Sequence, residues 1–478
     1  MQRVSEWLRG RSRADRALAM ITLIGLAVRV GYVLLARDQP VEGDGDGYYW
    51  SGLFLADGHG FVSSSAFRMN HSTSLSAAAD HPPGWILVFG AFALLGFQKV
   101  LYFQLLSCAV GAATVAAVGV AGRRIGGPRV GLIAAAIAAL YPNLWMYERV
   151  LQCETLALLL TALTISAAYR FRERPGTRGA IVLGLLVGLL TMTRPEALLI
   201  GLFVVAPVIW LRSSAAARDR LRWSALAGAV AVVPIVPWAA YNSSRFEEPV
   251  ILTTNLGQTL VASNCDATYY HGEIGWWNYG CLEAASMGIP GDAAQRDAEL
   301  QSMAFEYMGD HTRRFATVVL AREGRTFGLY KPFDQVRLES LGGPTHGVTR
   351  AGLLAYWPLL VLAIAGAVVL RRRRVSLVPL LGCVVTVVVA SGLTIGQTRY
   401  RALAEVPLVL LAAVTLASLS TWRRRSPAAA EAVDPDPLAE PGDPGDDVVA
   451  ARGNGNGRGD DADAETEADR QVEVPATT

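Results

Sequence analysis

Residues 43–50 have the sequence Gly-Asp-Gly-Asp-Gly-Tyr-Tyr-Trp, and they follow shortly after the first long apolar run of the chain, residues 17–36. A second polar motif, His81-Pro82-Pro83-Gly84, opens a short apolar piece further along. Acidic residues placed where a membrane-spanning helix ends lie at the level of the lipid headgroups. We therefore expect a flexible acidic turn at a membrane surface, around which the rest of the chain builds a site.

The composition of the chain sets its fold class. Of the 478 residues, 52% are hydrophobic, and the mean hydropathy is +0.32. Runs of about 18 or more nearly uncharged residues recur, and such runs are long enough to span a bilayer as helices. The sequence therefore predicts an all-α polytopic membrane protein and excludes a soluble globular domain. The first run reads as a retained helix, because no small-residue cleavage site follows it.

Charge is distributed unevenly along the chain. Residues 426–478 carry 14 acidic residues and 3 arginines, which leaves 40 basic and 27 acidic residues in the remainder. A basic membrane body is typical of proteins with an arginine excess on the cytoplasmic side. The acidic tail contains almost no aromatic residues, so we expect it to be disordered.

Arginine clusters predict the topology. Ten spans are expected, at residues 17–36, 100–122, 130–147, 151–169, 179–193, 196–211, 223–241, 351–370, 375–394 and 402–421. Each even-numbered span ends in an arginine cluster, whereas the short outward turns lack one, so both termini are expected in the cytoplasm. The apolar piece at 84–97 is too short to span comfortably, and we expect it to lie in the outer interface, a short crossing helix being the alternative.

This topology divides the chain into five parts. They are a cytoplasmic N-terminus (1–16), an N-terminal transmembrane module (17–241) with a catalytic extracytoplasmic loop (37–99), a large extracytoplasmic loop (242–349), the C-terminal transmembrane helices (350–422) and a disordered acidic cytoplasmic tail (423–478).

Charged residues collect at the outer ends of the predicted spans. They are Asp44, Asp46, His81, Glu154, Arg194, Glu196, Arg399 and Arg401. Because charges near membrane depth usually pair or serve a site, this set indicates a polar outer cavity. Asp44 is a candidate general base, and Asp46 offers the same chemistry. Paired carboxylates can hold a divalent cation, which stays an alternative, but no third ligand lies nearby in sequence, so no metal-ligand residues are predicted.

Several of these residues suit phosphate binding. The guanidinium groups of Arg194, Arg399 and Arg401 are candidates to clamp a phosphate, although Arg401 is equally suited to anchor at the headgroups. His81 is a candidate donor to a phosphate at a helix N-terminus, with a structural cap as the alternative. Lys331 is a weaker phosphate candidate. Glu154 and Glu196 either orient the arginines or contact substrate.

The large loop reads as a small folded element. Cys265 and Cys281 flank a polar, aromatic stretch, and they are expected to form a disulfide if the loop faces an oxidising compartment. Trp276 and Trp277 are candidates to stack on a sugar ring, to settle at the membrane interface or to pack within the loop. Tyr48 and Tyr49, beside the acidic turn, are further candidates for sugar or acceptor contact. Residues 292–330 show an amphipathic helical pattern.

Together these motifs resemble a known family. The acidic turn, the His-Pro-Pro helix, Cys153-Glu154-Thr155-Leu156, Thr193-Arg194-Pro195-Glu196 and Arg399-Tyr400-Arg401 are similar in order and sidedness to the family 39-like integral membrane glycosyltransferases. These are relatives of the protein O-mannosyltransferases and the lipid A aminoarabinose transferases. The Gly-, Ala- and Arg-rich, lysine-poor composition suggests an actinobacterial member.

The resemblance implies a GT-C-type fold and a polyprenyl-phosphate-linked sugar donor. It aligns Asp44 with the catalytic base, and His81 and the outward arginines with donor phosphate binding. The family's usual turn is Asp-Glu or Asp-Ala, whereas this chain has Asp-Gly-Asp, so Asp46 stays a competitor for the base. We expect an inverting transfer on the extracytoplasmic face to a hydroxyl of a protein, glycan or lipid, with no nucleic acid as partner and no certain cofactor.

Two other functions are compatible with a protein of this class. A lipid-linked saccharide transporter or flippase would need polar residues through the membrane midplane, but the middles of the predicted spans are Ala, Leu, Val and Gly. A non-catalytic cell-envelope assembly protein would use the acidic tail to hold a partner.

Overall fold

The computed structural model describes residues 12–63, 75–211, 215–340 and 343–423. The predicted disordered tail lies outside these residues. The regular secondary structure of these residues is helical, apart from an isolated bridge between Val62 and Ala77. Residues up to Arg425 belong to one compact unit, and all of the following description concerns that unit.

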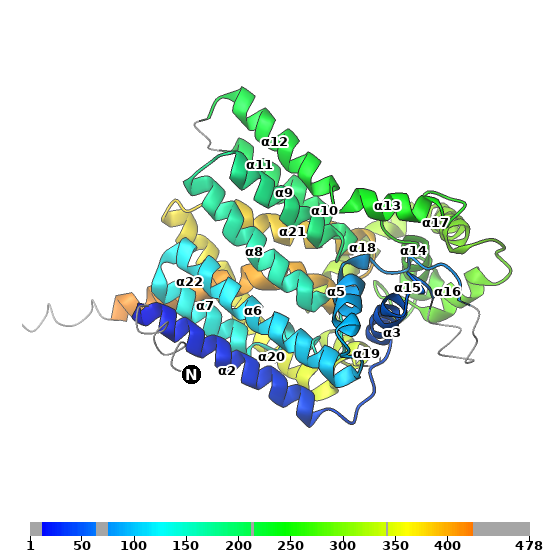
Figure 1. The fold of residues 1–478 in the computed structure, drawn as a ribbon, viewed down its shortest axis with the longest axis horizontal. Helices are drawn as coiled ribbons and strands as arrows, with labels where there is room; N and C mark the ends of the chain where they lie inside the picture. Colours follow the sequence, from blue (N-terminus) through cyan, green and yellow to red (C-terminus); the bar gives the residue numbers. More distant parts are fainter. Residues whose placement is uncertain (1–11, 64–74, 212–214, 341–342, 424–478) are drawn as a thin grey trace, which may run out of the picture. The chain divides into compact units, whose positions relative to one another are not determined.

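A bundle of helices forms the body of this unit (Figure 1). Its helices are α2 (Arg13–Leu35), α6 (Val100–Gly126), α7 (Pro128–Leu140), α8 (Glu154–Glu173), α9 (Thr177–Thr191), α12 (Ala217–Val232), α13 (Ile235–Ser243), α20 (His346–Arg372), α21 (Val378–Leu393) and α22 (Ala402–Arg423). A helical run through η2 (Pro195–Ala197), α10 (Leu198–Ile200), η3 (Gly201–Val205) and α11 (Ala206–Trp210) joins them.

Length and composition support a multi-pass membrane protein. Among the described helices, α2, α6, α20 and the segment Thr398–Leu419 are long and apolar enough to cross a membrane, and α12 and α13, bent by 44°, together make a fifth candidate. Every predicted span falls on a helix or helical run of the bundle, but several of these contain only 10–17 residues. The number ten therefore stays a prediction.

Small residues allow the helices to approach closely. A Cβ on Gly184 of α9 would lie 2.3 Å from the Ala227 carbonyl oxygen of α12, and one on Gly188 would lie 2.4 Å from that of Ala231. Glycine at such contacts lets two backbones touch, which is how membrane helices commonly associate. The apolar, glycine-rich sequence thus determines this interface directly.

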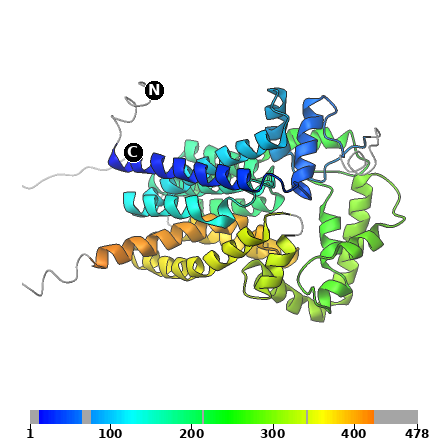
Figure 2. The ribbon, with the colours of Figure 1, turned by 90° about the horizontal axis from the view of Figure 1, so that it is seen from below.

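The remaining helices gather at one end of the bundle. They are α3 (Asp44–Ala56), α5 (Pro83–Leu94), α14 (Leu256–Ser263), α15 (Asp266–Tyr269), α16 (Tyr279–Ser286), α17 (Ala293–Asp310), α18 (Thr312–Thr326), α19 (Pro332–Glu339) and η4 (Thr398–Arg401). Figure 2 shows the beginning of α2 and the end of α22 at the opposite end. We call these two ends the loop end and the arginine end, because Arg123, Arg124 and Arg371–Arg374 lie at the second.

One expectation about local structure is wrong. Residues 43–50 do not form a flexible turn, because α3 begins at Asp44 and includes the whole Asp-Gly-Asp-Gly segment. The amphipathic region 292–330 forms two helices, α17 and α18, which are separated at His311. The short apolar piece expected at 84–97 corresponds to α5, a helix of 12 residues.

Candidate active site

Asp44 stands at the start of α3, at the loop end of the bundle. Its Oδ2 accepts a hydrogen bond from Arg399 Nη2 at 2.6 Å, and its Oδ1 lies 3.7 Å from His81 Nε2. The following glycine explains the position of the helix: a Cβ on Gly45 would lie 1.7 Å from the Val150 carbonyl oxygen. Gly45 is therefore needed for close packing of α3 against the segment before α8.

His81 is held between two carboxylates. Its Nδ1 lies 3.1 Å from Asp80 Oδ2, and its ring meets the buried Tyr48 ring edge-on at 4.6 Å. The chain then enters α5 through Pro82 and Pro83, where the missing proline N–H groups leave no helix hydrogen bond unmade. Tyr48 thus packs against the imidazole ring, and Asp80 orients this ring toward Asp44.

Arg399 belongs to a row of alternating charges. Its Nε lies 3.2 Å from Glu154 Oε1, and the same oxygen accepts from Arg194 Nη1 at 2.5 Å. Arg194 Nε donates to Glu196 Oε1, also at 2.5 Å, and the Arg194 guanidinium lies over the Tyr400 ring at 5.1 Å. Buried charges are tolerated when they are paired in this way. Three motifs that are far apart in the sequence therefore meet in one network.

A cavity of about 630 Å³ opens beside this network. Asp44, His81 and Arg399 line it, and so do Trp276 and Trp277. Uncharged hydrogen-bonding side chains complete much of the wall; they include Gln152, Asn255, Gln258, Thr259, Asn278 and Gln397. His81 and Arg399 can donate to an anionic group, although the carboxylates of Asp44 and Asp80 lie beside them, and the amide- and indole-rich lining suits a hydroxyl-rich group.

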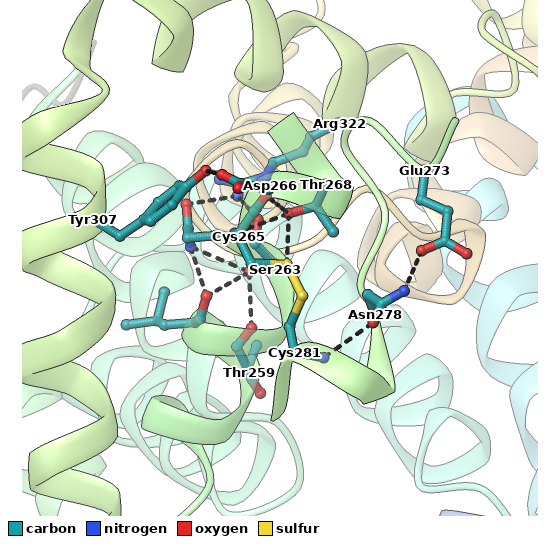
Figure 3. The surroundings of a disulfide bond; sticks show 12 residues. Thr259, Ser263, Cys265, Asp266, Thr268, Glu273, Asn278, Cys281, Tyr307 and Arg322 are labelled. Atoms are coloured by element: carbon teal, nitrogen blue, oxygen red, sulfur yellow. Dashed lines mark hydrogen bonds between the residues drawn. A yellow bond between two sulfur atoms is a disulfide. The ribbon is translucent and has the colours of Figure 1, made fainter. Parts of the chain in front are cut away.

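A disulfide lies beside the residues that line the cavity, and Figure 3 shows it with its neighbouring hydrogen bonds. Cys265 and Cys281 are bonded, and Glu273, Trp276, Trp277 and Asn278 lie in the loop between them. Asn278 caps α16 by accepting from the Cys281 amide at 3.0 Å, and its Nδ2 donates to Glu273 Oε2 at 2.6 Å. The cystine thus closes the loop that carries the two tryptophans, and Asn278 fixes its geometry.

Electrostatics keep the acid–base pair ionised. Desolvation opposes the charge on Asp44, but Arg399 and His81 outweigh it and hold the pKa of this carboxyl below its usual range. Burial also opposes protonation of His81, yet Asp80 and Asp44 raise the pKa of its imidazole to about 10. At neutral pH the cavity therefore presents the carboxylates of Asp44 and Asp80, an imidazolium and a guanidinium within one cluster.

Several residues singled out in the sequence lie away from this cavity. Asp46 and Tyr49 do not line it, and the Tyr49 hydroxyl donates to the Gln98 carbonyl at 2.9 Å. Lys331 Nζ donates to the Gly272 carbonyl at 2.5 Å, also outside the cavity lining. Arg401 is buried, with its Nε donating to Glu405 Oε1 at 2.7 Å. The alternative of a headgroup anchor for Arg401 does not fit this burial.

Sequence reasoning also missed residues of the site. Asp80 precedes His81 directly, so its pairing with the imidazole was available from the sequence. Glu339 lines the cavity and accepts from the Arg399 amide at 3.3 Å, and burial raises the pKa of its carboxyl. No local pattern marks Glu339, because α19 reaches the cavity only through the tertiary fold. Among the described residues, no three His, Cys, Asp or Glu side chains are grouped to hold a metal ion.

Part of this site lies in a region that is similar to a known protein family. Residues 80–241 match the family model of dolichyl-phosphate-mannose-protein mannosyltransferases. The matched region contains His81, Glu154, Arg194 and Glu196, while Asp44 and Arg399 lie outside it. The match confirms the resemblance expected from the sequence motifs. No curated protein is a significant sequence match to the chain.

Solved structures show which fold the chain has. One similar structure is the Archaeoglobus fulgidus oligosaccharyltransferase tethered with an acceptor peptide, with a TM-score of 0.54 and 12% identity over 88% of this chain and 51% of the other. The same protein in complex with an inhibitory peptide and a dolichol-phosphate gives a TM-score of 0.52 and 13% identity over 86% and 51%. The chain spans about half the length of these structures. At this identity they establish the fold, which is the predicted GT-C type.

Proposed function

We propose that the protein is a membrane glycosyltransferase that moves a sugar from a polyprenyl-phosphate donor to an acceptor hydroxyl. The observation that carries the proposal is the juxtaposition of Asp44, His81 and Arg399 on one cavity. Family and fold support it, since the mannosyltransferase model covers part of the site and the oligosaccharyltransferase structure was solved with a dolichol-phosphate. We further propose that the loop end faces the extracytoplasmic side and that both termini are cytoplasmic.

In this proposal Asp44 is the general base. The acceptor oxygen attacks the anomeric carbon while the bond from that carbon to the phosphate oxygen breaks, which inverts the anomeric configuration. The acceptor proton passes to Asp44, and the phosphate leaves on its lipid. Phosphate is a good leaving group, so no general acid is needed. The positive charges of Arg399 and His81 stabilise the charge that develops on the phosphate.

The observed ion pair explains how donor binding would prepare the base. Arg399 contacts Asp44 at 2.6 Å and therefore holds the pKa of the carboxyl low, which makes Asp44 a weak base. A donor phosphate at Arg399 competes for the same guanidinium and weakens its pull on Asp44. The carboxylate consequently becomes more basic when the donor is bound.

Other residues hold these groups in place. Glu154 is fully buried and pairs with both Arg399 and Arg194, so we assign it and Arg194 a positioning role. Trp276 and Trp277 supply the wall against which a sugar ring stacks, and the acceptor is a protein, glycan or lipid that enters the same cavity. Tyr48 supports His81 and does not contact the sugar.

The test is donor consumption by purified protein incubated with a panel of polyprenyl-phosphate sugars. Asp44→Asn removes the base without changing side-chain size, so we expect transfer to fall by about 10²–10⁴-fold. Asp46→Asn is the matched control, because it removes the same charge from the same helix, and it should retain activity within about twofold. The assignment is wrong if Asp44→Asn stays active and Asp46→Asn does not.

A further inference from the structure

A second cavity, of about 910 Å³, lies at the arginine end of the bundle. The end of α8, the run through η3 and α11, the end of α20 and the start of α21 surround it. Apolar side chains form most of its wall, among them Phe203, Leu377 and Leu381. Its basic residues are Arg172, Arg371 and Arg374, and no acidic side chain lines it among the residues that the structure describes. We call it the arginine groove.

The apolar side of the groove faces outward from the bundle. Leu211 is 52% exposed, and Leu381 and Val385 of α21 are each 41% exposed. In a multi-pass membrane protein, such side chains lie at the depth of the lipid acyl chains. The floor is well defined, because Gly382 packs directly against the Phe203 carbonyl, to which a Cβ would lie at 2.3 Å. The groove is thus open to lipid and closed toward the protein core.

The basic rim includes an arginine in a costly backbone conformation. The Val375 amide donates to the Leu370 carbonyl at 3.0 Å and the Arg374 amide to the Arg371 carbonyl at 3.1 Å, a Schellman motif that ends α20. Arg374 occupies the left-handed position of this motif, with φ +57°, where glycine is the usual residue. The chain therefore retains a guanidinium at the groove where the backbone favours glycine.

The rim is tied to both neighbouring elements. Arg172 Nη1 donates to the Leu211 carbonyl at 3.3 Å, which holds this guanidinium at the mouth of the groove. The Tyr169 hydroxyl donates to the Ser376 carbonyl at 2.7 Å and joins α8 to the beginning of α21. The basic side chains consequently sit on a braced framework of helix ends rather than on a free terminus.

We propose that the arginine groove binds an anionic phospholipid. The phosphodiester lies among Arg172, Arg371 and Arg374, and an acyl chain follows the apolar floor between α21 and the run through η3 and α11. Charge complementarity supports this occupant, since the three arginines of the rim suit a phosphodiester and an outward apolar floor suits hydrocarbon. The proposal is independent of glycosyl transfer and depends only on the membrane placement of the bundle.

The test measures lipid binding to the purified full-length chain in detergent. Phosphatidylglycerol is titrated against phosphatidylcholine, with retained lipid counted by native mass spectrometry and stabilisation followed by the midpoint of thermal unfolding. We expect saturable, preferential binding of phosphatidylglycerol. Arg371→Ala and Arg374→Gly should each weaken that binding by about fivefold, the value of one arginine near an anionic lipid surface.

Arg374→Gly separates binding from folding. Glycine relieves the left-handed backbone strain, so the lipid-free protein should unfold at the same temperature as the parent or higher, while the lipid-induced shift decreases. Arg372→Ala is the matched control, since Arg372 is an exposed neighbour that does not line the groove. Equal weakening by Arg372→Ala, equal affinity for phosphatidylcholine, or saturation by soluble glycerol phosphate would each overturn the proposal. Retained glycosyl transfer in the same variants distinguishes this result from failure of the proposed enzyme function.

Discussion

Two arginines of one short segment, Arg399 and Arg401, belong to two clusters with opposite exposure. The Arg399 side chain is 23% exposed, lines the loop-end cavity and contacts Asp44 at 2.6 Å. The Arg401 side chain is 1% exposed and pairs with Glu405 at 2.7 Å inside the bundle. Two similar ion pairs, only two residues apart in the chain, thus lie in different environments.

Hydrogen bonding explains the difference. Around Arg401, both Glu405 oxygens are occupied: Oε2 accepts from the Tyr141 hydroxyl at 3.0 Å and Oε1 from Asn143 Nδ2 at 3.2 Å. The Arg401 guanidinium also lies 3.6 Å from the Tyr356 ring centroid. This cluster is sealed and suits a structural role. The Asp44–Arg399 pair opens onto a cavity and is available to a ligand. The exposure of each ion pair, not its residue types, therefore distinguishes a pair suited to catalysis from one suited to a structural role.

The largest effect should come from breaking the sealed pair. Arg401→Met leaves the Glu405 charge buried without its partner, which we expect to lower the free energy of unfolding by about 3–5 kcal/mol. Thermal unfolding in detergent measures this change. In the double variant Arg401→Met/Glu405→Gln, both charges are gone and the amide still accepts from Tyr141, so most of the stability should return. No recovery in the double variant would mean that arginine packing, not charge, is responsible.

Substitution of Arg399 should affect catalysis more than stability. Arg399→Gln removes the guanidinium that the proposed mechanism places at the donor phosphate, so transfer should fall by about 10²–10³-fold. The melting midpoint should change less than in Arg401→Met, because Glu154 keeps Arg194 as a partner. Arg399→Lys keeps the positive charge but loses the two parallel N–H donors of the guanidinium, so its transfer rate should lie between those of the parent and Arg399→Gln. A variant that loses stability but keeps transfer would reverse the comparison.

Much of the fold was predictable from the sequence. The apolar runs predict the helices of the bundle, because helix formation depends on local composition. The family motifs predict the GT-C fold, because their order along the chain is typical of that fold. The helix at residues 44–56 was not predicted, because three glycines in five residues are typical of turns. Its stability depends on tertiary packing: Gly45 allows contact with the Val150 carbonyl, which no local pattern reveals.

The site was predictable in part. Its residue types and their common face followed from the positions at the outer ends of predicted spans, and Asp44, His81 and Arg399 do meet. The sequence did not separate Asp44 from Asp46 or Arg399 from Arg401, since residues two apart on a helical turn point in different directions that depend on helix orientation. Glu339 was missed for a related reason, as it reaches the cavity from a separate helix.

The smallest expected effect is a pH dependence that distinguishes the open cluster from an ordinary histidine site. Asp80 and Asp44 face the His81 ring nitrogens, and Tyr48 packs on the ring; together the carboxylates raise the pKa of His81 to about 10 from its ordinary value near 6.5. The stability that protonated His81 contributes is therefore fully present below pH 6.5 and is lost as the pH rises through about 10. Between pH 6.5 and pH 8.5 we therefore expect the difference in melting midpoint between the parent and His81→Gln to decrease steadily, because His81 loses its proton in the unfolded state and keeps it in the folded state. The transfer rate should show no inflection attributable to His81 between pH 6 and pH 8.5. Because the pKa values of Asp44 and Asp80 are lowered by the same pairs, their contribution persists above the ordinary carboxyl pKa and is lost only as the pH falls below it. An inflection of the transfer rate near pH 6.5 that disappears in His81→Gln would show that the imidazole is not held between charged carboxylates.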